Sequence, residues 1–438
     1  MKPHRSAARV LPRWPRANRP EAISQRQNSL KALPHWDAAH QHVLTWPVPA
    51  EVLANFQECL TGHLVLPVGV VGLLPLNLGH YVLDATGAVR EEGRAEEHVF
   101  VPLAHTEGGL SASVQRGISA ATLAGGVRTH VLADRMTRDS CFVFHTTAEA
   151  LTLARWVAEQ ASAMAVWLRD AANPLRIPAT GSRESGGKNL VSTHAVLREV
   201  ETHVVGPMCH VLYRFTTGDA CGPNMMTRNA YALNQEFVLA RFPRDTGVTP
   251  LHVFLETNMG GDKKPSHAFF QFPGHGKVVL AEATLPGDVL RQVLRVSAEE
   301  VLVLEHTGLH GAHASGMQSF AFTPASAIAA IFAATGQDLG MVGTSSMAQA
   351  TATRVGDGIH LAIRFSGIEV GTVGGGTSLP HARSYLQLMD CLGPGKVYRF
   401  AQIIAATALC LELSAAASMA ASGSQNFLQA HLARGGMR

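Results

Sequence analysis

The 438-residue sequence predicts an α/β (α+β) fold, in which a large mixed helix/sheet domain carries an inserted ferredoxin-like domain. A chain of this length can bury a large core and usually divides into two or three domains. Its 46% hydrophobic and 16% charged residues are typical of a globular protein. Residues 141–256 read as β-α-β-β-α-β, the split βαβ pattern. No expected strand is followed by GxGxxG, so the inserted unit is expected to be of non-Rossmann type.

Residues 1–45 are predicted to be a disordered basic tail. Residues 1–20 hold six basic residues and no acid, so the rest of the chain has 30 basic and 33 acidic residues. This balance does not support a basic groove for nucleic acid. Pro12, Pro15 and Pro20 interrupt the start, where a secretory signal would have an apolar run.

The first part of the large domain is placed at residues 46–139. Residues 64–72 read as a strand that ends at glycines, and 81–83 and 97–101 as short strands. Apolar residues at four-residue spacing predict a helix over 107–123. Glu107 then falls in its first turn, where the helix dipole favours a carboxylate.

The inserted small domain is placed at residues 140–261. Its expected strands are 141–144, 196–205, 209–215 and 251–255. Its expected helices are 147–168 and 225–240, with a polar loop at 172–187.

The large domain is expected to resume over residues 262–423. Pro324 should open a helix that ends at Gly336. Strands are expected at 359–365 and 369–373, a flexible turn at 374–376, and a helix at 399–419. The apolar stretch 401–423 contains Glu412 and several serines, so a core helix is favoured over a membrane span. A hinge at 421–424 would carry a mobile flap, residues 424–438.

The six cysteines show no CxxC spacing, which indicates free thiols in a reducing compartment and agrees with a cytoplasmic protein. No metal site is expected. His35, Asp37, His40 and His42 lie in the predicted tail, and His310 and His313 lack a third ligand at a recognisable spacing.

The most informative stretch is Asp262-Lys263-Lys264-Pro265. The neighbouring acid raises the pKa of Lys263 and the second lysine lowers it. A lysine whose charge is adjusted by its neighbours in this way suits an oxyanion site. Glu107, Asp338 and His431 each stand in a distinctive setting elsewhere in the chain. An acid, a lysine, a second acid and a histidine so far apart can meet only in a folded site.

Five motifs in order resemble those of the 3-hydroxy-3-methylglutaryl-CoA reductase family, and the resemblance covers roughly residues 52–434. They are Pro102-Leu103-Ala104-His105-Thr106-Glu107-Gly108, Gly218-Asp219-Ala220-Cys221-Gly222-Pro223-Asn224-Met225, Asp262-Lys263-Lys264-Pro265, Gly336-Gln337-Asp338 and Gly371-Thr372-Val373-Gly374-Gly375-Gly376-Thr377. The resemblance implies a class I-like catalytic domain without the family's membrane domain. It also implies a small cofactor domain inserted into a larger substrate domain.

The family reduces an acyl-CoA thioester to an alcohol in two hydride transfers from NADPH or NADH. The resemblance implies that Lys263 stabilises the oxyanion and Glu107 supplies a proton to the reduced carbonyl oxygen. Asp338 would bridge the two and raise the pKa of Glu107. His431, on the C-terminal flap, would protonate the CoA thiolate. The resemblance further implies a homodimer, or a higher oligomer of dimers, with active sites that draw on two chains.

The remaining site residues follow from the same resemblance. Arg138 would bind the free carboxylate of the acyl group, for which a guanidinium is apt. The other expected substrate contacts are Ser113, Arg116, Lys264 and His306, and the expected cofactor contacts are Asp219, Asn224, Met225, Gly374, Gly375 and Gly376.

Some positions depart from the family pattern. His306 stands near the position where the family usually has a lysine, and Glu256 or Thr257 stands near the position where it often has a serine. Arginines for the cofactor's 2′-phosphate are not evident around residues 193–196. The choice between NADPH and NADH therefore stays open, as does a reductase for another acyl-CoA or carrier-protein thioester. A non-catalytic relative that binds acyl-CoA is a further alternative, although it would have no use for the four catalytic candidates together.

Overall fold

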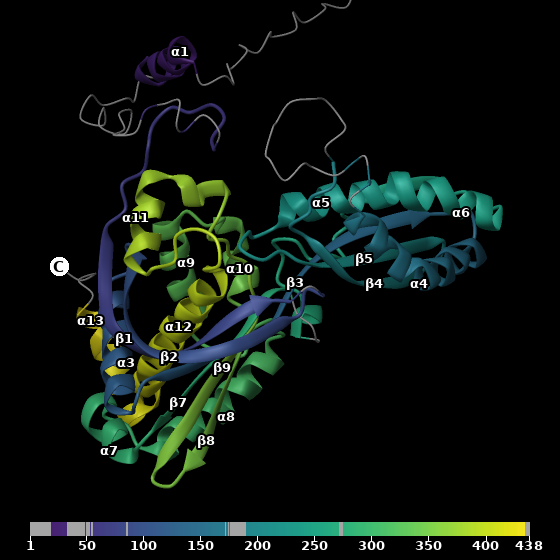
Figure 1. Ribbon diagram of the computed structural model, residues 1–438. Helices are drawn as coiled ribbons and strands as arrows, with labels where there is room; N and C mark the ends of the chain where they lie inside the picture. Colours follow the sequence, from purple (N-terminus) through teal and green to yellow (C-terminus); the bar gives the residue numbers. More distant parts are fainter. Residues whose placement is uncertain are drawn as a thin grey trace, which may run out of the picture.

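The computed structural model describes residues 19–32, 49, 53, 56–84, 86–170, 172–173, 175, 190–270 and 275–433. Most of the predicted tail 1–45, including His35 to His42, lies outside the described residues, as does most of the loop 172–187. In Figure 1 a larger body holds the C-terminal end of the described chain, and a smaller body projects to one side of it.

The larger body is built on a mixed sheet with the strand order β2-β1-β3-β7-β9-β8. Neighbouring strands are antiparallel except for the short parallel pairing of β1 with β3. The strands are β1 Val68–Leu83, β2 Val89–Ala104, β3 Val127–Val143, β7 Gly276–Leu285, β8 Ala348–Val355 and β9 Gly358–Ile368.

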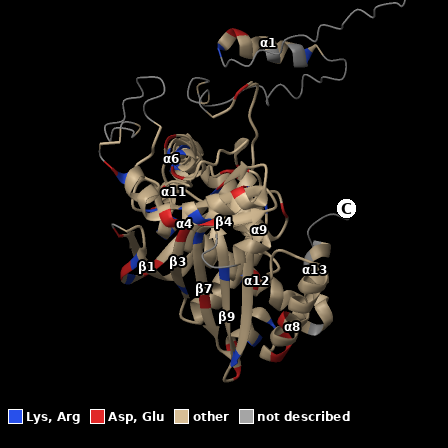
Figure 2. Ribbon diagram, turned by 90° about the vertical axis from the view of Figure 1, so that its right-hand side faces the viewer, with Lys and Arg blue, Asp and Glu red and all other residues tan. Residues whose placement is uncertain are grey.

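Helices α3 (Leu110–Leu123), α9 (Pro324–Thr335) and α12 (Val397–Ala420) contribute much of the core of the larger body. α3 and α12 touch closely, because a Cβ on Gly117 would lie only 1.9 Å from the carbonyl oxygen of Cys410. α12 is the one helix within the described residues that is long and apolar enough to cross a membrane. Most of it is buried, as expected for a core helix, and charged residues are sparse along α9 and α12 (Figure 2).

The smaller body contains the predicted ferredoxin-like sheet, in the antiparallel order β6-β3-β5-β4. Its strands β4 Val196–Val205, β5 Met208–Thr216 and β6 His252–Leu255 agree closely with the sequence prediction. Its helices are α4 (Thr147–Arg169), α5 (Pro223–Ala232), the π-helix η2 (Leu233–Val238) and α6 (Leu239–Thr246), and together these elements enclose a separate hydrophobic core.

Strand β3 belongs to both sheets. Residues up to Arg135 pair with β7, and residues from Met136 onward pair with β5. At this junction Lys277 Nζ lies 3.5 Å from Asp134 Oδ1, and both side chains are buried. Asp134 also accepts hydrogen bonds from Tyr398 Oη (3.0 Å) and Gly218 N (3.0 Å). A buried ion pair thus fixes the 217–222 segment where the two bodies meet.

The remaining helical elements complete the described chain. They are α1 Pro20–Lys31, η3 His267–Phe270, α7 Gly287–Val289, η4 Leu290–Leu294, α8 Ala298–Ala314, η5 Leu339–Met341, α10 Val342–Ser345, η6 Gly375–Ser378, α11 Pro380–Leu388, η7 Ala421–Ser424 and α13 Gln425–Ala433.

Four local predictions are wrong. β1 does not end at Gly72 but continues in register with β2 to Leu83. Residues 369–373 form no strand, since Gly371 N and Thr372 N bond to Gln337 and Asp219. α1 forms within the predicted tail, where Ile23 is buried and Gln27 donates to Thr61 O (2.8 Å). Finally, α3 begins after Gly109, so Glu107 precedes the helix and lies outside its first turn.

Candidate active site

A cavity of about 460 Å³ lies where the two bodies meet. Its walls come from β3, the start of α5, the Asp262–Lys263 turn, the segment after α9 and the glycine turn near residue 374. These segments are distant in sequence, yet the cavity unites many of the predicted site residues. Those that line it are Arg138, Asn224, Met225, Lys263, Asp338, Gly374, Gly375 and Gly376.

Lys263 and Asp338 form the central ion pair. Lys263 Nζ lies 2.7 Å from Asp338 Oδ2, and both side chains are about half exposed. The hydrogen bond to Asp338 raises the pKa of Lys263, although partial desolvation opposes the shift. Asp338 Oδ1 accepts from Gly340 N at 2.9 Å, which fixes the carboxylate at the start of η5. The cavity is therefore lined by the charged amine of Lys263, which is paired with a carboxylate held in a fixed position.

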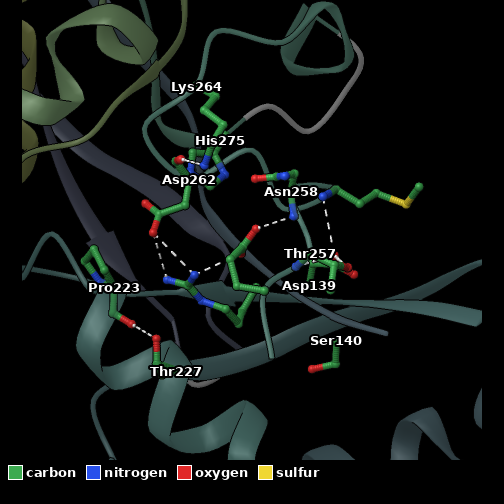
Figure 3. Close-up of polar contacts among 12 residues, drawn as sticks. Asp139, Ser140, Pro223, Thr227, Thr257, Asn258, Asp262, Lys264 and His275 are labelled. Atoms are coloured by element: carbon green, nitrogen blue, oxygen red, sulfur yellow. Dashed lines mark hydrogen bonds and ion pairs between the residues drawn. The ribbon is translucent and has the colours of Figure 1, made fainter. Parts of the chain in front are cut away.

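The loop that precedes the Lys263 turn is held by Asp139 of β3, which lies beside Thr257 in Figure 3. The fully buried Asp139 carboxylate accepts hydrogen bonds from Thr257 N (3.0 Å) and Met259 N (3.3 Å). It also contacts His210 Nδ1 at 3.2 Å. Sequence reasoning missed Asp139, because its importance comes from a loop far away in the chain.

Arg138 lies one residue earlier in β3, and its side chain is only 5% exposed. Its Nη1 donates to Glu256 Oε2 at 2.9 Å and to Asp262 Oδ2 at 3.3 Å. Asp262 precedes Lys263, so Arg138 also anchors the lysine turn, and Lys264 Nζ bonds to Asp262 O at 3.0 Å. Glu256 was noted in the sequence only as a departure from a serine.

The glycine turn packs against the residues that follow α9. A Cβ on Gly376 would lie 2.2 Å from Gly336 O, so glycine is required for this approach. Gln337, between Gly336 and Asp338, accepts from Gly371 N at 3.0 Å. Cβ atoms added at Gly374 or Gly375 would meet no heavy atom within 4 Å, so this backbone faces open space.

Two residues of the 217–222 segment have structural partners. The Asp219 carboxylate does not line the cavity but accepts from Gly395 N, Lys396 N and Val397 N at the start of α12. Cys221 lines the cavity and contacts Met341 Sδ at 3.3 Å. Burial raises the pKa of the Cys221 thiol, so an ionised cysteine is disfavoured there.

Seven predicted residues do not line this cavity within the described chain: Glu107, Ser113, Arg116, Asp219, Lys264, His306 and His431. Ser113 Oγ and Arg116 Nε both lie 2.9 Å from Ser414 Oγ on α12. Burial lowers the pKa of Arg116. His306 is exposed on α8, next to His310.

His431 lies on α13, and Glu107 lies between β2 and α3. His431 is exposed, and its Nδ1 is 2.9 Å from Phe427 O. Glu107 is likewise exposed. Within one chain, Lys263 and Asp338 thus lie together, whereas Glu107 and His431 do not join them.

Comparisons with known proteins agree on one family. The family model described as hydroxymethylglutaryl-coenzyme A reductase matches residues 22–435. A 3-hydroxy-3-methylglutaryl-coenzyme A reductase of Aeropyrum pernix is 33% identical over 404 residues, covering 89% of this chain and 86% of the relative. The Pyrococcus abyssi enzyme of the same name is 32% identical and covers 85% of this chain and 83% of its own.

Solved structures show the same fold. The class II 3-hydroxy-3-methylglutaryl-CoA reductase from Streptococcus pneumoniae, bound to NADPH in open conformations, superposes with a TM-score of 0.60. The match covers 91% of this chain and 94% of that one at 16% sequence identity, so it supports the architecture.

Proposed function

Since the chain belongs to the hydroxymethylglutaryl-coenzyme A reductase family, we propose that it reduces 3-hydroxy-3-methylglutaryl-CoA to mevalonate and CoA. Members of the family are NAD(P)H-dependent oxidoreductases, and so is this chain. The observation that carries the proposal is the Lys263–Asp338 pair, set in one cavity with the glycine turn 374–376.

Lys263 is the proposed oxyanion donor. Thioester reduction places negative charge on the carbonyl oxygen, and a preorganised cation stabilises that charge most where it develops. Asp338 keeps the amine both charged and oriented. Glu107 is proposed to give a proton to the alkoxide. His431 is proposed to protonate the departing CoA thiolate, since an imidazole can release and regain a proton near neutral pH.

Lys263 would hold the hemithioacetal oxyanion that forms when the thioester carbonyl takes up a first hydride, which the nicotinamide cofactor would supply. The C–S bond then breaks, releasing CoA with the His431 proton and leaving an aldehyde. A second hydride and the Glu107 proton give the alcohol, so two reduced nicotinamides are consumed for each mevalonate.

Residues around the cavity fit a nicotinamide cofactor, NADPH or NADH, which supplies hydride when bound. Gly374 and Gly375 present backbone with open space beyond it, as a flat ring at close approach requires. Asn224 and Met225 are proposed to contact the cofactor from the start of α5. Asp219 is proposed to contribute to cofactor binding indirectly, because its carboxylate fixes the 217–222 segment to the start of α12.

We further propose a homodimer whose active sites join Lys263 and Asp338 of one chain to Glu107 of another. Val70, Leu73 and Phe100 expose about half of their apolar side chains along the paired strands β1 and β2. Such a patch is typical of a surface that is covered in an assembly. We propose that residues 46–139 and 262–423 form the large domain, residues 140–261 the small domain and residues 424–438 a mobile flap. We propose that the enzyme is cytoplasmic.

One observation favours a second candidate, a reductase for a different acyl thioester. Arg138, the proposed receptor of the acyl carboxylate, is already paired with Glu256 and Asp262.

A spectrophotometric assay tests the proposed function. The purified chain is mixed with 3-hydroxy-3-methylglutaryl-CoA and either NADPH or NADH, while nicotinamide absorbance, free thiol and mevalonate are followed. We expect two nicotinamides oxidised for each thiol and each mevalonate formed. Absence of turnover with both nucleotides, in a folded protein that binds NADPH, would refute the proposal.

A further inference from the structure

Arg138 is enclosed by carboxylates that belong to the protein itself. Its Nη1 donates to Glu256 Oε2 at 2.9 Å and to Asp262 Oδ2 at 3.3 Å, and its Nη2 donates to Asp262 Oδ2 at 3.4 Å. The Arg138 side chain is 5% exposed, against 20% for Glu256 and 22% for Asp262. Arg138 lines the cavity, as does Asp262, so the guanidinium that borders the cavity already has two carboxylate partners.

Glu256 is fixed in this position by its own backbone. It follows the last residue of β6 and has φ 69°, a left-handed conformation that is uncommon for a residue with a Cβ. Its Oε1 accepts from Asn258 N at 3.0 Å, which leaves Oε2 directed at Arg138. The Glu256–Arg138 contact is thus part of the turn and not a chance surface pair.

Charges around Arg138 are unfavourable for a third carboxylate. One guanidinium faces two carboxylates, so the cluster carries one net negative charge. Of the two lysines on the same turn, Lys263 is paired with Asp338, and Lys264 Nζ donates to the backbone oxygen of Asp262. In a partly buried site, like charges repel more strongly than they do in water. An acyl group with a free carboxylate must therefore compete with Glu256 and Asp262 for the Arg138 guanidinium.

We infer that Glu256 is a specificity-determining residue, which occupies Arg138 and disfavours acyl groups that end in a carboxylate. The inference rests on the proposed function, since it takes Arg138 to be the receptor for the far end of the acyl group. It also specifies the substrate class of that function. Acyl thioesters whose far end is uncharged compete effectively with 3-hydroxy-3-methylglutaryl-CoA as substrates of the same site.

The test compares two thioesters that differ at one end only. 3-Hydroxy-3-methylbutyryl-CoA keeps the tertiary alcohol and the thioester of 3-hydroxy-3-methylglutaryl-CoA but lacks its carboxylate. kcat/KM is measured for both thioesters with the wild-type enzyme and with Glu256→Gln. The glutamine keeps the size of the side chain and one acceptor oxygen, which can serve either Asn258 N or Arg138, and removes the competing charge. Glu299→Gln, an exposed carboxylate on α8 that is paired with Arg354, is the matched control.

We expect Glu256→Gln to raise the ratio of kcat/KM for the carboxylated over the uncharged thioester by about tenfold or more. The gain should come through a lower KM for 3-hydroxy-3-methylglutaryl-CoA, and Glu299→Gln should leave the ratio unchanged. A ratio in Glu256→Gln within twofold of wild type, or below it, would overturn the inference while the proposed function stands. Absence of turnover of both thioesters by the wild-type enzyme would remove the proposed function and this inference with it.

Discussion

Lys263 and Asp338 meet at 2.7 Å, although one follows β6 and the other follows α9. The lysine has a left-handed φ of 58°, and its carboxylate partner is fixed by Gly340 N. Its raised pKa keeps the amine charged at neutral pH. A second pair, Lys396 with Asp390 at 2.8 Å, has a similar distance, lies outside the cavity lining and provides matched controls.

Lys263→Ala should abolish thioester reduction without unfolding the protein. Loss of an oxyanion donor costs about 3 kcal/mol or more of transition-state stabilisation, which is at least about a hundredfold in kcat. The measurement is steady-state kinetics together with thermal unfolding, and Lys396→Ala should retain wild-type kcat. A folded Lys263→Ala enzyme that kept more than roughly a tenth of kcat would rule out the assigned role.

Asp338→Asn should shift the alkaline limb of the kcat/KM profile to lower pH. Activity that needs a charged Lys263 is present below the lysine pKa and is lost as the pH rises through it. Asp338 raises that pKa, so its neutral replacement lowers it and the loss begins earlier. The profile is measured for wild type, Asp338→Asn and Asp390→Asn, and only the second should shift. An unmoved alkaline limb in Asp338→Asn would show that Lys263 does not control it.

The Lys263–Asp338 meeting could be predicted from sequence because both residues belong to short motifs whose order is informative. The ferredoxin-like sheet was predictable as well, since its strands and helices alternate clearly between Cys141 and Glu256. Partners that depend on the packing of distant segments were not predictable. Asp219, for example, matched a cofactor motif, yet its carboxylate binds the first backbone N–H groups of α12.

Strand limits failed for a similar reason. Gly69 and Gly72 suggested the end of a strand, but pairing with β2 carries β1 onward to Leu83. Pairing with a neighbouring strand overrides the weak tendency of glycine to end a strand. Glu256 shows the same limit in the site. Its neighbourhood in the sequence gives no sign of Arg138, which reaches it from β3.

Glu412 on α12 should be important for stability, because it caps another helix from within the core. Its carboxylate accepts from Phe322 N (2.7 Å) and Thr323 N (2.9 Å), just before α9 begins. Glu412→Ala would leave these partly buried donors without their acceptor, which costs up to roughly 1–3 kcal/mol for each. Urea unfolding should rank wild type above Glu412→Gln, and Glu412→Gln above Glu412→Ala. The exposed Glu299→Ala should match wild type, and an equally small effect in Glu412→Ala would contradict the capping role.

Val70→Glu should weaken the proposed dimer and its activity together. Val70 is 52% exposed on β1, and a charge buried there on association would lack a partner. Leu151→Glu, at a 45% exposed position on α4, is the control and should leave assembly unchanged. Sedimentation velocity and kcat are measured across a range of protein concentrations. A fully active wild-type monomer would refute the shared active site.

Removal of the chain after Gly423 should separate a catalytic His431 from a structural one. Gly423 and Ser424 have left-handed φ values of 64° and 67°, which mark the turn between α12 and α13. A flap that closes here would present His431 to the thiolate. The truncated enzyme should therefore lose thioester reduction far more than reduction of the free aldehyde intermediate, which releases no thiol. His431→Ala should reproduce the selective loss, whereas His203→Ala, on β4 of the smaller body, should not. A misfolded enzyme would lose both activities together, so equal loss on the two substrates, or none, would remove His431 from the mechanism.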